Sequence, residues 1–435
     1  MRLDWRARSG RPLTGSIRVP GDKSVSHRAI MLASLAEGTS HIRGFLEGED
    51  TRATARCFAQ MGVRIEAPND GERMVHGVGL RGLKAPTAAL DCGNAGTAMR
   101  LMCGVMAAQS FASVLVGDES LTKRPMARVI DPLSEMGAVI GSAEGKRPPL
   151  HVSPALMLHG RRFRPPVASA QIKSALLLAG LYAEGETWVS EVHPTRDYTE
   201  SMLRGFGVEV MQEGDAVGVR GGQVLRATDI DVPTDFSSAA FFLVAASIIP
   251  GSDLTIRDVG LNPRRTGLLD TLRDMGADID VLNARSAGAE VLADLRVRAT
   301  RLRGIVVPEA RVPDMIDEFP ALFVAAAVAE GPTTISGAAE LRVKESDRIH
   351  VMAVALAAMG VVIEERPDGA VIQGDTHWRG AHVDSHGDHR CAMSLGIAAQ
   401  FVGDDCTIID CRNVDTSFPG FLDLATGCGL DIRPV

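Results

Sequence analysis

The sequence predicts a mixed α/β fold built from six copies of one small unit. Polar or charged clusters open hydrophobic runs, and further along each copy a helix-like stretch ends in a Gly-containing, β-like tail. The spacing of about 70 residues is longer than that of ordinary solenoid repeats, which favours a small α/β unit in each copy. The tails are Met61–Val63, Met136–Ala138, Phe206–Val208, Met275–Ala277, Met359–Val361 and Cys428–Leu430. The openers are Ser24–Arg28, Asn94–Thr97, Ser169–Gln171, Asp235–Ser238, Pro313–Met315 and Gly387–Arg390.

One copy shows the expected order of elements. Ser237 and Ser238 are suited to cap a helix, and Gly residues are suited to end the two helices of the copy. The predicted elements are a helix to Ala246, a strand over Leu254–Ile256, a helix over Thr266–Met275 and a strand from Ala277. The same pattern predicts helices over Met126–Met136, Met315–Ala329 and Ile349–Met359, and a strand over Gly15–Val19.

Six copies could form one solenoid or two bodies of three. A strand precedes the first opener, and a polar, Gly-rich stretch over 214–232 leads into the fourth. We therefore predict a discontinuous domain of residues 1–20 plus 235–435 and an inserted domain of residues 21–234, each with three units.

Composition limits the possible functions. The chain has 435 residues, a formal net charge of −8 and a pI of about 5.8, which argues against a nucleic-acid-binding surface. Seven cysteines without a CxxC pair indicate reduced thiols, and the N-terminal residues contain no apolar signal segment. The apolar runs are shorter than the roughly 20 residues of a membrane span. We expect a cytoplasmic protein.

The first opener is a candidate anion site. Lys23, Ser24 and Arg28 stand where an apolar helix begins, and Arg28 lies about one turn after Ser24. Backbone N–H groups at a helix start, a lysine and a forked arginine together suit a phosphate or carboxylate. One such segment alone is equally typical of a capped helix with solvated charges, but the pattern recurs at later openers.

Other charged residues allow a structural and a functional interpretation. Arg124 and Arg196 stand in loops and could be solvated, and Val343–Arg348 could be a capping cluster for the helix that follows. Asp314 could be a helix cap or a general base among cations. One short loop region could suggest a metal site, but its non-helical spacing and the adjacent Arg390 argue against a dication there. The residues of this cluster are His382, Asp384, His386, Asp388 and His389.

At these residues the chain resembles the 5-enolpyruvylshikimate-3-phosphate (EPSP) synthase family of enolpyruvyl transferases, from about Gly15 to Phe421. The motifs that carry the resemblance are Pro20–Arg28, Gly93–Thr97 with Arg100, Arg124-Pro125, Ser169–Gln171, Pro313-Asp314, Val343–Arg348 and Asp388–Arg390. The resemblance implies a two-domain inside-out α/β barrel with three βαβαββ units per domain and an active site in the cleft between the domains. It also implies transfer of the enolpyruvyl group of phosphoenolpyruvate to the 5-hydroxyl of shikimate 3-phosphate, with release of phosphate.

The resemblance also implies residue roles. Asp314 would accept the proton of the 5-hydroxyl, and Glu345 or Lys23 would protonate the methylene carbon. Shikimate 3-phosphate would be bound by Lys23, Ser24, Arg28, Ser169, Ala170, Gln171, Arg196, Asp314 and Lys344. Phosphoenolpyruvate would be bound by Lys23, Gly96, Arg124, Gln171, Arg348 and Arg390.

The resemblance implies no metal and no organic cofactor, and we expect a monomer without nucleic-acid or membrane partners. Two departures from the family pattern stand out. Thr416 occupies a position where many members have a lysine, and Arg196 resembles a variant branch in which arginine contacts a phosphate. Gly96 is retained where some glyphosate-insensitive members have alanine, so we expect glyphosate to inhibit.

Alternative functions are the related transferase that acts on UDP-N-acetylglucosamine, a non-catalytic anion-binding homologue and a metallohydrolase. The first of these normally has a loop cysteine, and none lies between Gln109 and Arg124 here.

Overall fold

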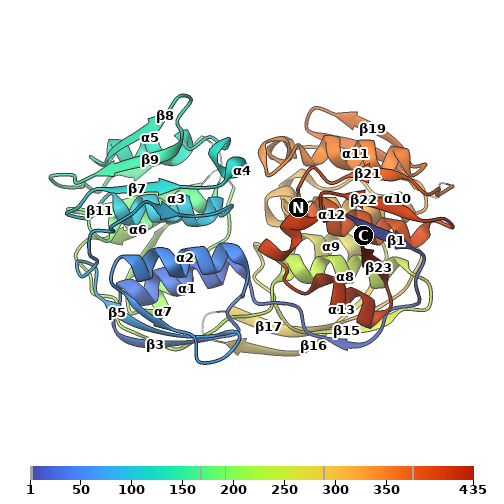
Figure 1. Cartoon of the computed structure of the whole chain (residues 1–435), viewed down its shortest axis with the longest axis horizontal. Helices are drawn as coiled ribbons and strands as arrows, with labels where there is room; N and C mark the ends of the chain where they lie inside the picture. Colours follow the sequence, from blue (N-terminus) through green and yellow to red (C-terminus); the bar gives the residue numbers. More distant parts are fainter. Residues whose placement is uncertain (1–2, 167–168, 192, 288–289, 375–376) are drawn as a thin grey trace. The chain divides into compact units, whose positions relative to one another are not determined.

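The computed structural model describes residues 3–166, 169–191, 193–287, 290–374 and 377–435. Helices and strands alternate along these residues, which confirms the predicted mixed α/β class (Figure 1). The chain divides into two compact units. Unit 1 comprises Met1–Pro20, Pro233–Ser286 and Val291–Val435, and unit 2 comprises Gly21–Val232 with Ala287–Glu290.

Unit 2 contains three sets of elements, each with one sheet. The first set is β14 (Ile230–Asp231), α1 (Lys23–Leu35), β3 (Glu37–Arg43), α2 (Glu49–Gln60), β4 (Arg64–Glu66) and β5 (Glu72–Val78). The second is β6 (Leu90–Asp91), α3 (Gly96–Met106), β7 (Ser113–Val116), α4 (Glu119–Thr122), α5 (Ala127–Glu135), β8 (Val139–Ala143) and β9 (Arg147–Ser153). The third is β10 (Arg162–Phe163), α6 (Ala170–Gly180), β11 (Glu186–Ser190), α7 (Tyr198–Gly205), β12 (Val210–Glu213) and β13 (Ala216–Arg220).

Unit 1 also contains three sets. The first is β2 (Thr14–Ile17), α8 (Phe236–Ile248), β15 (Asp253–Gly260), α9 (Gly267–Asp274), β16 (Asp278–Ala287) and β17 (Glu290–Arg298). The second is the 3₁₀ helix η1 (Glu309–Met315), α10 (Phe319–Val328), β18 (Pro332–Ile335), η2 (Ala339–Val343), α11 (Arg348–Ala358), β19 (Val362–Arg366) and β20 (Gly369–Gln373). The third is β21 (His382–Asp384), α12 (His389–Ala398), η3 (Ala399–Phe401), β22 (Cys406–Ile409), η4 (Arg412–Thr416), α13 (Phe421–Cys428), β23 (Asp431–Pro434) and β1 (Trp5–Arg8).

The sheets share one pattern of strand pairing. A short or edge strand lies parallel to the strand that follows the first helix of the set, as β14 does to β3, β6 to β7, β10 to β11, β2 to β15 and β21 to β22. In the second set of unit 1, only isolated parallel bridges such as Val306–Thr334 take this place. Antiparallel pairs, such as β5 with β3 and β20 with β18, extend the sheets.

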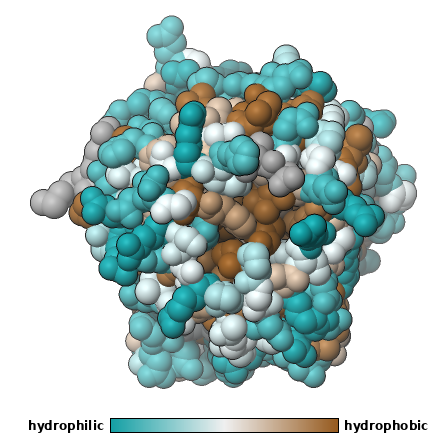
Figure 2. All heavy atoms as spheres, turned by 90° about the vertical axis from the view of Figure 1, so that its right-hand side faces the viewer, coloured by the Kyte–Doolittle hydropathy of each residue, from teal (hydrophilic) through white to brown (hydrophobic). Residues whose placement is uncertain are grey.

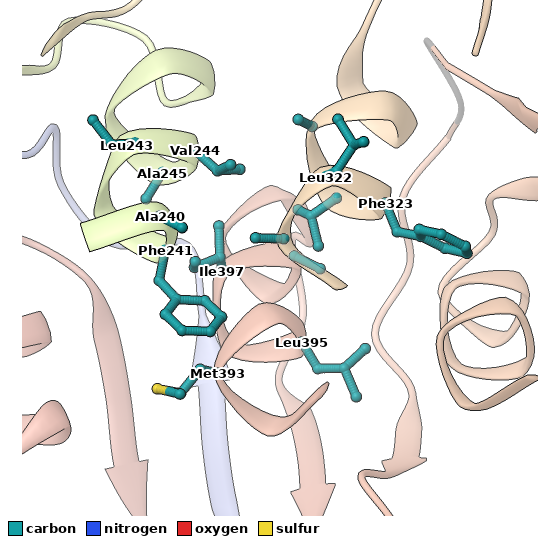
Figure 3. Packing of buried hydrophobic residues seen from close by; sticks show 14 of the residues in the cluster. Ala240, Phe241, Leu243, Val244, Ala245, Leu322, Phe323, Met393, Leu395 and Ile397 are labelled. Atoms are coloured by element: carbon teal, nitrogen blue, oxygen red, sulfur yellow. The ribbon is translucent and has the colours of Figure 1, made fainter. Parts of the chain in front are cut away.

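The first helix of each set forms the core of its unit. Every residue of α8 is buried, and α10 and α12 are almost as deeply buried. Figure 3 shows Val244, Leu322 and Ile397 of these three helices within one packed cluster. Because a helix that is apolar on all sides must be surrounded by protein, its charged side chains are placed near its ends. The helix starts are therefore the places where charged side chains gather.

The Gly residue in each tail follows the last α-helix of its set. Gly62, Gly137, Gly207, Gly276 and Gly360 all have φ between 82° and 106°, and Gly429 has φ 134°. Glycine adopts this left-handed conformation without the steric cost of a Cβ atom, which is why it follows helices so often. The predicted helix ends are confirmed at these six positions.

Two predictions about helix starts are wrong. Asp314 does not lie at the start of an α-helix over Met315–Ala329, because it belongs to the 3₁₀ helix η1 and α10 begins at Phe319. Proline at position 320 is tolerated in the first turn of α10 but would clash with a carbonyl in the interior of a longer helix. Asp235, and not Ser237 or Ser238, caps α8, and its carboxylate accepts a hydrogen bond from the Ser237 N–H at 2.9 Å.

Hydrophilic residues cover much of the face shown in Figure 2, with apolar residues gathered near its middle. Within the described ranges, no helix is long and apolar enough to cross a membrane.

Candidate active site

The start of α1 places the first group of predicted residues in unit 2. Asp22 caps the helix by accepting a hydrogen bond from the Val25 N–H at 2.8 Å. Lys23 is largely buried and forms an ion pair with Asp50, which lies in the first turn of α2. Ser24 follows at the same end of the helix, and its backbone carbonyl accepts a hydrogen bond from Arg28 Nη1 at 2.9 Å.

Arg28 is buried within unit 2 and is held mainly by neutral groups. Its Nε donates to Thr199 Oγ1 at 2.7 Å, and its Nη2 donates to Ser174 Oγ at 2.8 Å. Burial is the main reason that the pKa of Arg28 is lowered to about 10; the charges of Glu200 and Asp22 oppose the lowering, and the nearby charge of Arg196 contributes to it. The guanidinium therefore stays charged at neutral pH, and Arg196 lies close enough for its charge to act on Arg28.

Gln171 links the starts of two core helices. Its side-chain oxygen accepts a hydrogen bond from Arg100 Nη1 at 2.7 Å, and its Nε2 donates to Thr97 Oγ1 at 2.8 Å. Thr97 and Arg100 belong to α3, whereas Gln171 belongs to the first turn of α6 and follows Ser169 and Ala170. The structure thus brings together residues that are more than 70 positions apart in the sequence.

Gly96 lies against two arginines at the start of α3. A Cβ atom at this position would lie 3.1 Å from Arg100 Nη1 and 3.2 Å from Arg124 Nη1. Arg124 follows α4 and donates from Nη2 to Asn94 Oδ1 at 2.7 Å and to Ser120 Oγ at 3.2 Å. The absence of a side chain at Gly96 therefore lets both guanidinium groups approach the helix start, where backbone N–H groups also favour an anion.

In unit 1, Asp314 lies in η1 beside a cation. Arg264 Nη1 is 3.7 Å from Asp314 Oδ2, and the Asp314 side chain is 18% exposed. Gly267 of α9 packs closely on η1, with only 3.1 Å between a Cβ built on it and the Asp314 carbonyl carbon.

Arg348, at the start of α11, is 1% exposed and is surrounded by carboxylates. Its Nε lies 2.8 Å from Asp388 Oδ2, its Nη2 lies 2.7 Å from Glu345 Oε2, and its Nη1 lies 3.4 Å from Asp317 Oδ1. Burial would lower the pKa of Arg348, but the three carboxylates outweigh that effect and raise it. The charge of Arg348 likewise keeps the pKa of buried Asp388 below its usual value, against the opposing effect of burial.

Lys344 and Arg390 share partners with Arg348. Lys344 Nζ lies 3.1 Å from Glu340 Oε1 and 3.8 Å from Asp317 Oδ1. Arg390 Nη1 donates to the Asp317 carbonyl at 3.1 Å. Asp317 therefore contacts all three cations that the sequence analysis assigned to substrates in this unit.

Several of these contact residues were missed by sequence reasoning. Asp317 and Glu318 stand three and four positions after the predicted residue Asp314, and Glu318 Oε1 lies 3.7 Å from Arg390 Nη1. Arg265 is 3% exposed and donates to Asp235 at 2.8 Å. The only sequence signal for these contacts was the position of Asp317 and Glu318 directly before the apolar run that begins at Phe319. In unit 2, Thr199 and Ser174 gave no signal, because hydroxyl residues are common in helices.

The structure also shows the surroundings of Thr416, which stands where many family members have a lysine, and of Asp388 in the loop that contains the histidine cluster. Thr416 ends η4, and its hydroxyl donates to the Asn413 carbonyl at 2.6 Å. In the loop before α12, Asp388 caps the helix and binds Arg348. Among the described residues, no group of three or more His, Cys, Asp or Glu side chains is arranged to hold a metal ion.

Comparisons with known proteins agree on one family. The family model for EPSP synthase (3-phosphoshikimate 1-carboxyvinyltransferase) matches residues 7–424. A curated 3-phosphoshikimate 1-carboxyvinyltransferase of Xanthomonas campestris pv. campestris is 63% identical over 99% of this chain and 98% of its own length.

Solved structures give the same result. An EPSP synthase structure from Acinetobacter baumannii is 50% identical, covers 100% of both chains and superposes with a TM-score of 0.90. The enolpyruvyl transferase NikO of Streptomyces tendae has the same fold, with a TM-score of 0.81 at 17% identity and coverage of 100% of this chain and 99% of its own. The chain belongs to the EPSP synthase family.

Proposed function

We propose that this chain transfers the enolpyruvyl group of phosphoenolpyruvate to the 5-hydroxyl of shikimate 3-phosphate and releases inorganic phosphate. The observation that carries the proposal is the grouping of cations near helix starts in each unit. In unit 1, Glu345 is bound to Arg348, and Asp314 lies beside Arg264. Membership of the EPSP synthase family supports the same transferase reaction.

The charges of the substrates fit this arrangement. Each substrate carries one carboxylate and one phosphate of about −1.5 to −2, so the two together bring roughly −5 to −6. The chain as a whole has a net charge of −8, so it must offset the substrates locally. The cations available for this are Lys23, Arg28, Arg100, Arg124, Arg196, Lys344, Arg348 and Arg390.

We assign shikimate 3-phosphate to the starts of α1 and α6. Lys23, Ser24 and Arg28 supply one side, and Ser169, Ala170 and Gln171 supply another. Arg196 supports a contact with the phosphate because its charge already acts on Arg28 in the free protein. Lys344 and Asp314 complete the assignment from unit 1.

We assign phosphoenolpyruvate to the start of α3 and to the arginines of unit 1. Gly96 leaves room beside Arg124, and Gln171 is oriented by Arg100 and Thr97. Arg348 and Arg390 provide forked donors that suit a carboxylate or phosphate. Since the assigned residues belong to both units, the proposal requires both units to contribute to one site during turnover.

The reaction proceeds by addition and elimination. Asp314 accepts the proton of the 5-hydroxyl as the hydroxyl oxygen bonds to C2 of phosphoenolpyruvate, and Glu345 or Lys23 gives a proton to C3. C3 of the adduct then loses a proton while the bond from C2 to the phosphate oxygen breaks, which regenerates the alkene and releases phosphate. In the free protein, Arg348 donates a hydrogen bond to Glu345. A phosphoenolpyruvate carboxylate bound to Arg348 would replace Glu345 as the acceptor, and Glu345 could then carry a proton.

We further propose that the chain works as a monomer in the cytoplasm, with each unit folded as an inside-out barrel. All seven cysteines are free thiols, which suits a reducing compartment.

The direct test is phosphate release from the purified protein mixed with both substrates. We expect release only when both are present, and formation of one enolpyruvyl ether per phosphate. Replacing shikimate 3-phosphate by UDP-N-acetylglucosamine should give none. No release with the correct pair, despite detectable binding of shikimate 3-phosphate, would favour a non-catalytic anion-binding protein.

A further inference from the structure

The segment that leads into α7 is fastened to a buried group of charges. Lys173 Nζ lies 2.8 Å from Glu191 Oε2 and 2.8 Å from Glu200 Oε1, and the three side chains are only 3%, 7% and 3% exposed. Lys173 belongs to α6, Glu191 follows β11 and Glu200 belongs to α7. The group therefore joins three elements of unit 2.

Thr195 is bound by this group on every polar atom. Its backbone N–H donates to Glu191 Oε2 at 3.0 Å, and its hydroxyl donates to Glu191 Oε1. Its carbonyl accepts a hydrogen bond from Lys173 Nζ at 3.3 Å. A loop residue whose N–H, hydroxyl and carbonyl are all held by buried side chains has little freedom to move, so the residue after it is presented in a fixed place.

Burying Lys173, Glu191 and Glu200 costs desolvation free energy, which indicates that these residues have a role other than stabilising the fold. One lysine and two carboxylates are buried together, and the charge of Glu200 also acts on buried Arg28. Burying charged groups is expensive even when they are paired. Burial tends to lower the pKa of Lys173, yet the two carboxylates raise it overall. Apolar side chains of similar size would hold the same three elements together at a lower cost in desolvation.

We propose that Lys173, Glu191 and Thr195 form a clamp that positions Arg196 for the phosphate of the shikimate substrate. This inference rests on the proposed function, because that function places Arg196 on the phosphate. The clamp residues are positioning residues that act through Arg196. Lys173 also lies in the same turns of α6 as Ser169, Ala170 and Gln171, so the clamp ties the Arg196 loop to a second region assigned to that substrate.

The test compares shikimate 3-phosphate with shikimate, which lacks the phosphate, in calorimetric binding to the full chain. Thr195→Val, which removes only the hydroxyl donor, and Glu191→Gln should weaken binding of shikimate 3-phosphate by roughly five- to thirty-fold, as expected for loss of a hydrogen bond to a charged group. Binding of shikimate and the KM for phosphoenolpyruvate should change by less than about two-fold. Thr195→Ser keeps the hydroxyl and should restore wild-type affinity.

A double variant separates a clamp from a general structural role. Thr195→Val added to Arg196→Ala should weaken phosphate recognition no further than Arg196→Ala alone, because the clamp acts through that arginine. Glu47→Gln is the matched control, since Glu47 also accepts hydrogen bonds from an arginine and a loop N–H in the same unit. It should lower thermal stability without changing the affinity for shikimate 3-phosphate.

The outcomes distinguish the inference from the proposed function. Wild-type affinity in Thr195→Val, or additive effects in the double variant, would overturn the clamp while leaving the proposed function standing. Unchanged affinity in Arg196→Ala would overturn both the role of Arg196 and the clamp. Failure of the wild-type protein to bind shikimate 3-phosphate would overturn the proposed function itself. If Glu191→Gln does not fold, Thr195→Val decides the question.

Discussion

Arg28 of unit 2 lies near the start of α1, and Arg348 of unit 1 lies at the start of α11. Both arginines are buried, but the groups that hydrogen-bond to them differ in charge. Two hydroxyls and a backbone carbonyl hold Arg28, whereas three carboxylates hold Arg348. The pKa of Arg28 is lowered to about 10 by burial, and that of Arg348 is raised by its carboxylates. The comparison teaches that a cation held by neutral groups keeps its charge available for a substrate anion, whereas one held by carboxylates is already compensated and serves the architecture as well.

The largest effect should come from the carboxylates of unit 1 that carry chemistry. Asp314→Asn and Glu345→Gln should each lower kcat by about 10²- to 10⁴-fold, because each removes one proton transfer. Binding of shikimate 3-phosphate should remain detectable by calorimetry. Arg28→Met should show the reverse pattern, with lost affinity for that substrate. Full kcat in either carboxylate variant would mean that its assigned role is wrong.

The two arginines should differ in their effect on stability. Arg348→Met leaves Asp388 buried without its cation and should lower the free energy of unfolding by about 3–5 kcal/mol. Arg28→Met should cost only about 1 kcal/mol, because the hydroxyls of Ser174 and Thr199 already lie 2.7 Å apart and hydrogen-bond to each other. Urea denaturation measures both, with the exposed Arg56→Met as control. Equal losses in the free energy of unfolding for Arg28→Met and Arg348→Met would contradict the difference between the two arginines.

A smaller effect is expected at Gly96. In Gly96→Ala the new methyl group would press on the guanidinium groups of Arg100 and Arg124, at a cost of about 1–2 kcal/mol. The KM for phosphoenolpyruvate should therefore rise roughly five- to thirty-fold, while the KM for shikimate 3-phosphate stays nearly constant. Glyphosate should compete with phosphoenolpyruvate in the wild type and bind less tightly to the variant. A variant with unchanged kinetics for both ligands would place the phosphoenolpyruvate site elsewhere.

The smallest effect concerns pH. Burial, with the charges of Lys23 and Arg28, lowers the pKa of His27 well below its ordinary value, and its Nδ1 lies 2.7 Å from Thr54 Oγ1. The folded state therefore takes up a proton less readily than the unfolded state, whose pKa is about 6.5. Stability from neutral His27 is complete above that pH and falls as the pH drops below it, by about 1.4 kcal/mol per pH unit. His27→Gln should flatten the dependence of Tm on pH between about 6.5 and 5, and an unchanged slope would contradict this.

Much of the fold was predictable because local chemistry determined it. Each tail glycine marks a left-handed residue after a helix, and Asp347, within the predicted capping cluster Val343–Arg348, caps α11. The start of α10 was missed because the restriction imposed by Pro320 outweighed the apolar run before it.

The site was predictable only where a residue combined charge with a helix start. Lys23 and Arg348 gave such a signal. Asp317, Arg265 and Thr199 did not, since their importance comes from contacts between elements far apart in the sequence.

The position of β1 has a consequence for biosynthesis. This strand, near the N-terminal end of the described chain, lies between β22 and β23, which are formed by residues some four hundred positions later. While the ribosome is still translating, β1 has no neighbours to pair with, whereas all the residues of Gly21–Val232 have already emerged. Unit 2 is thus available to fold first, and the sheet that contains β1 closes only when β23 leaves the exit tunnel.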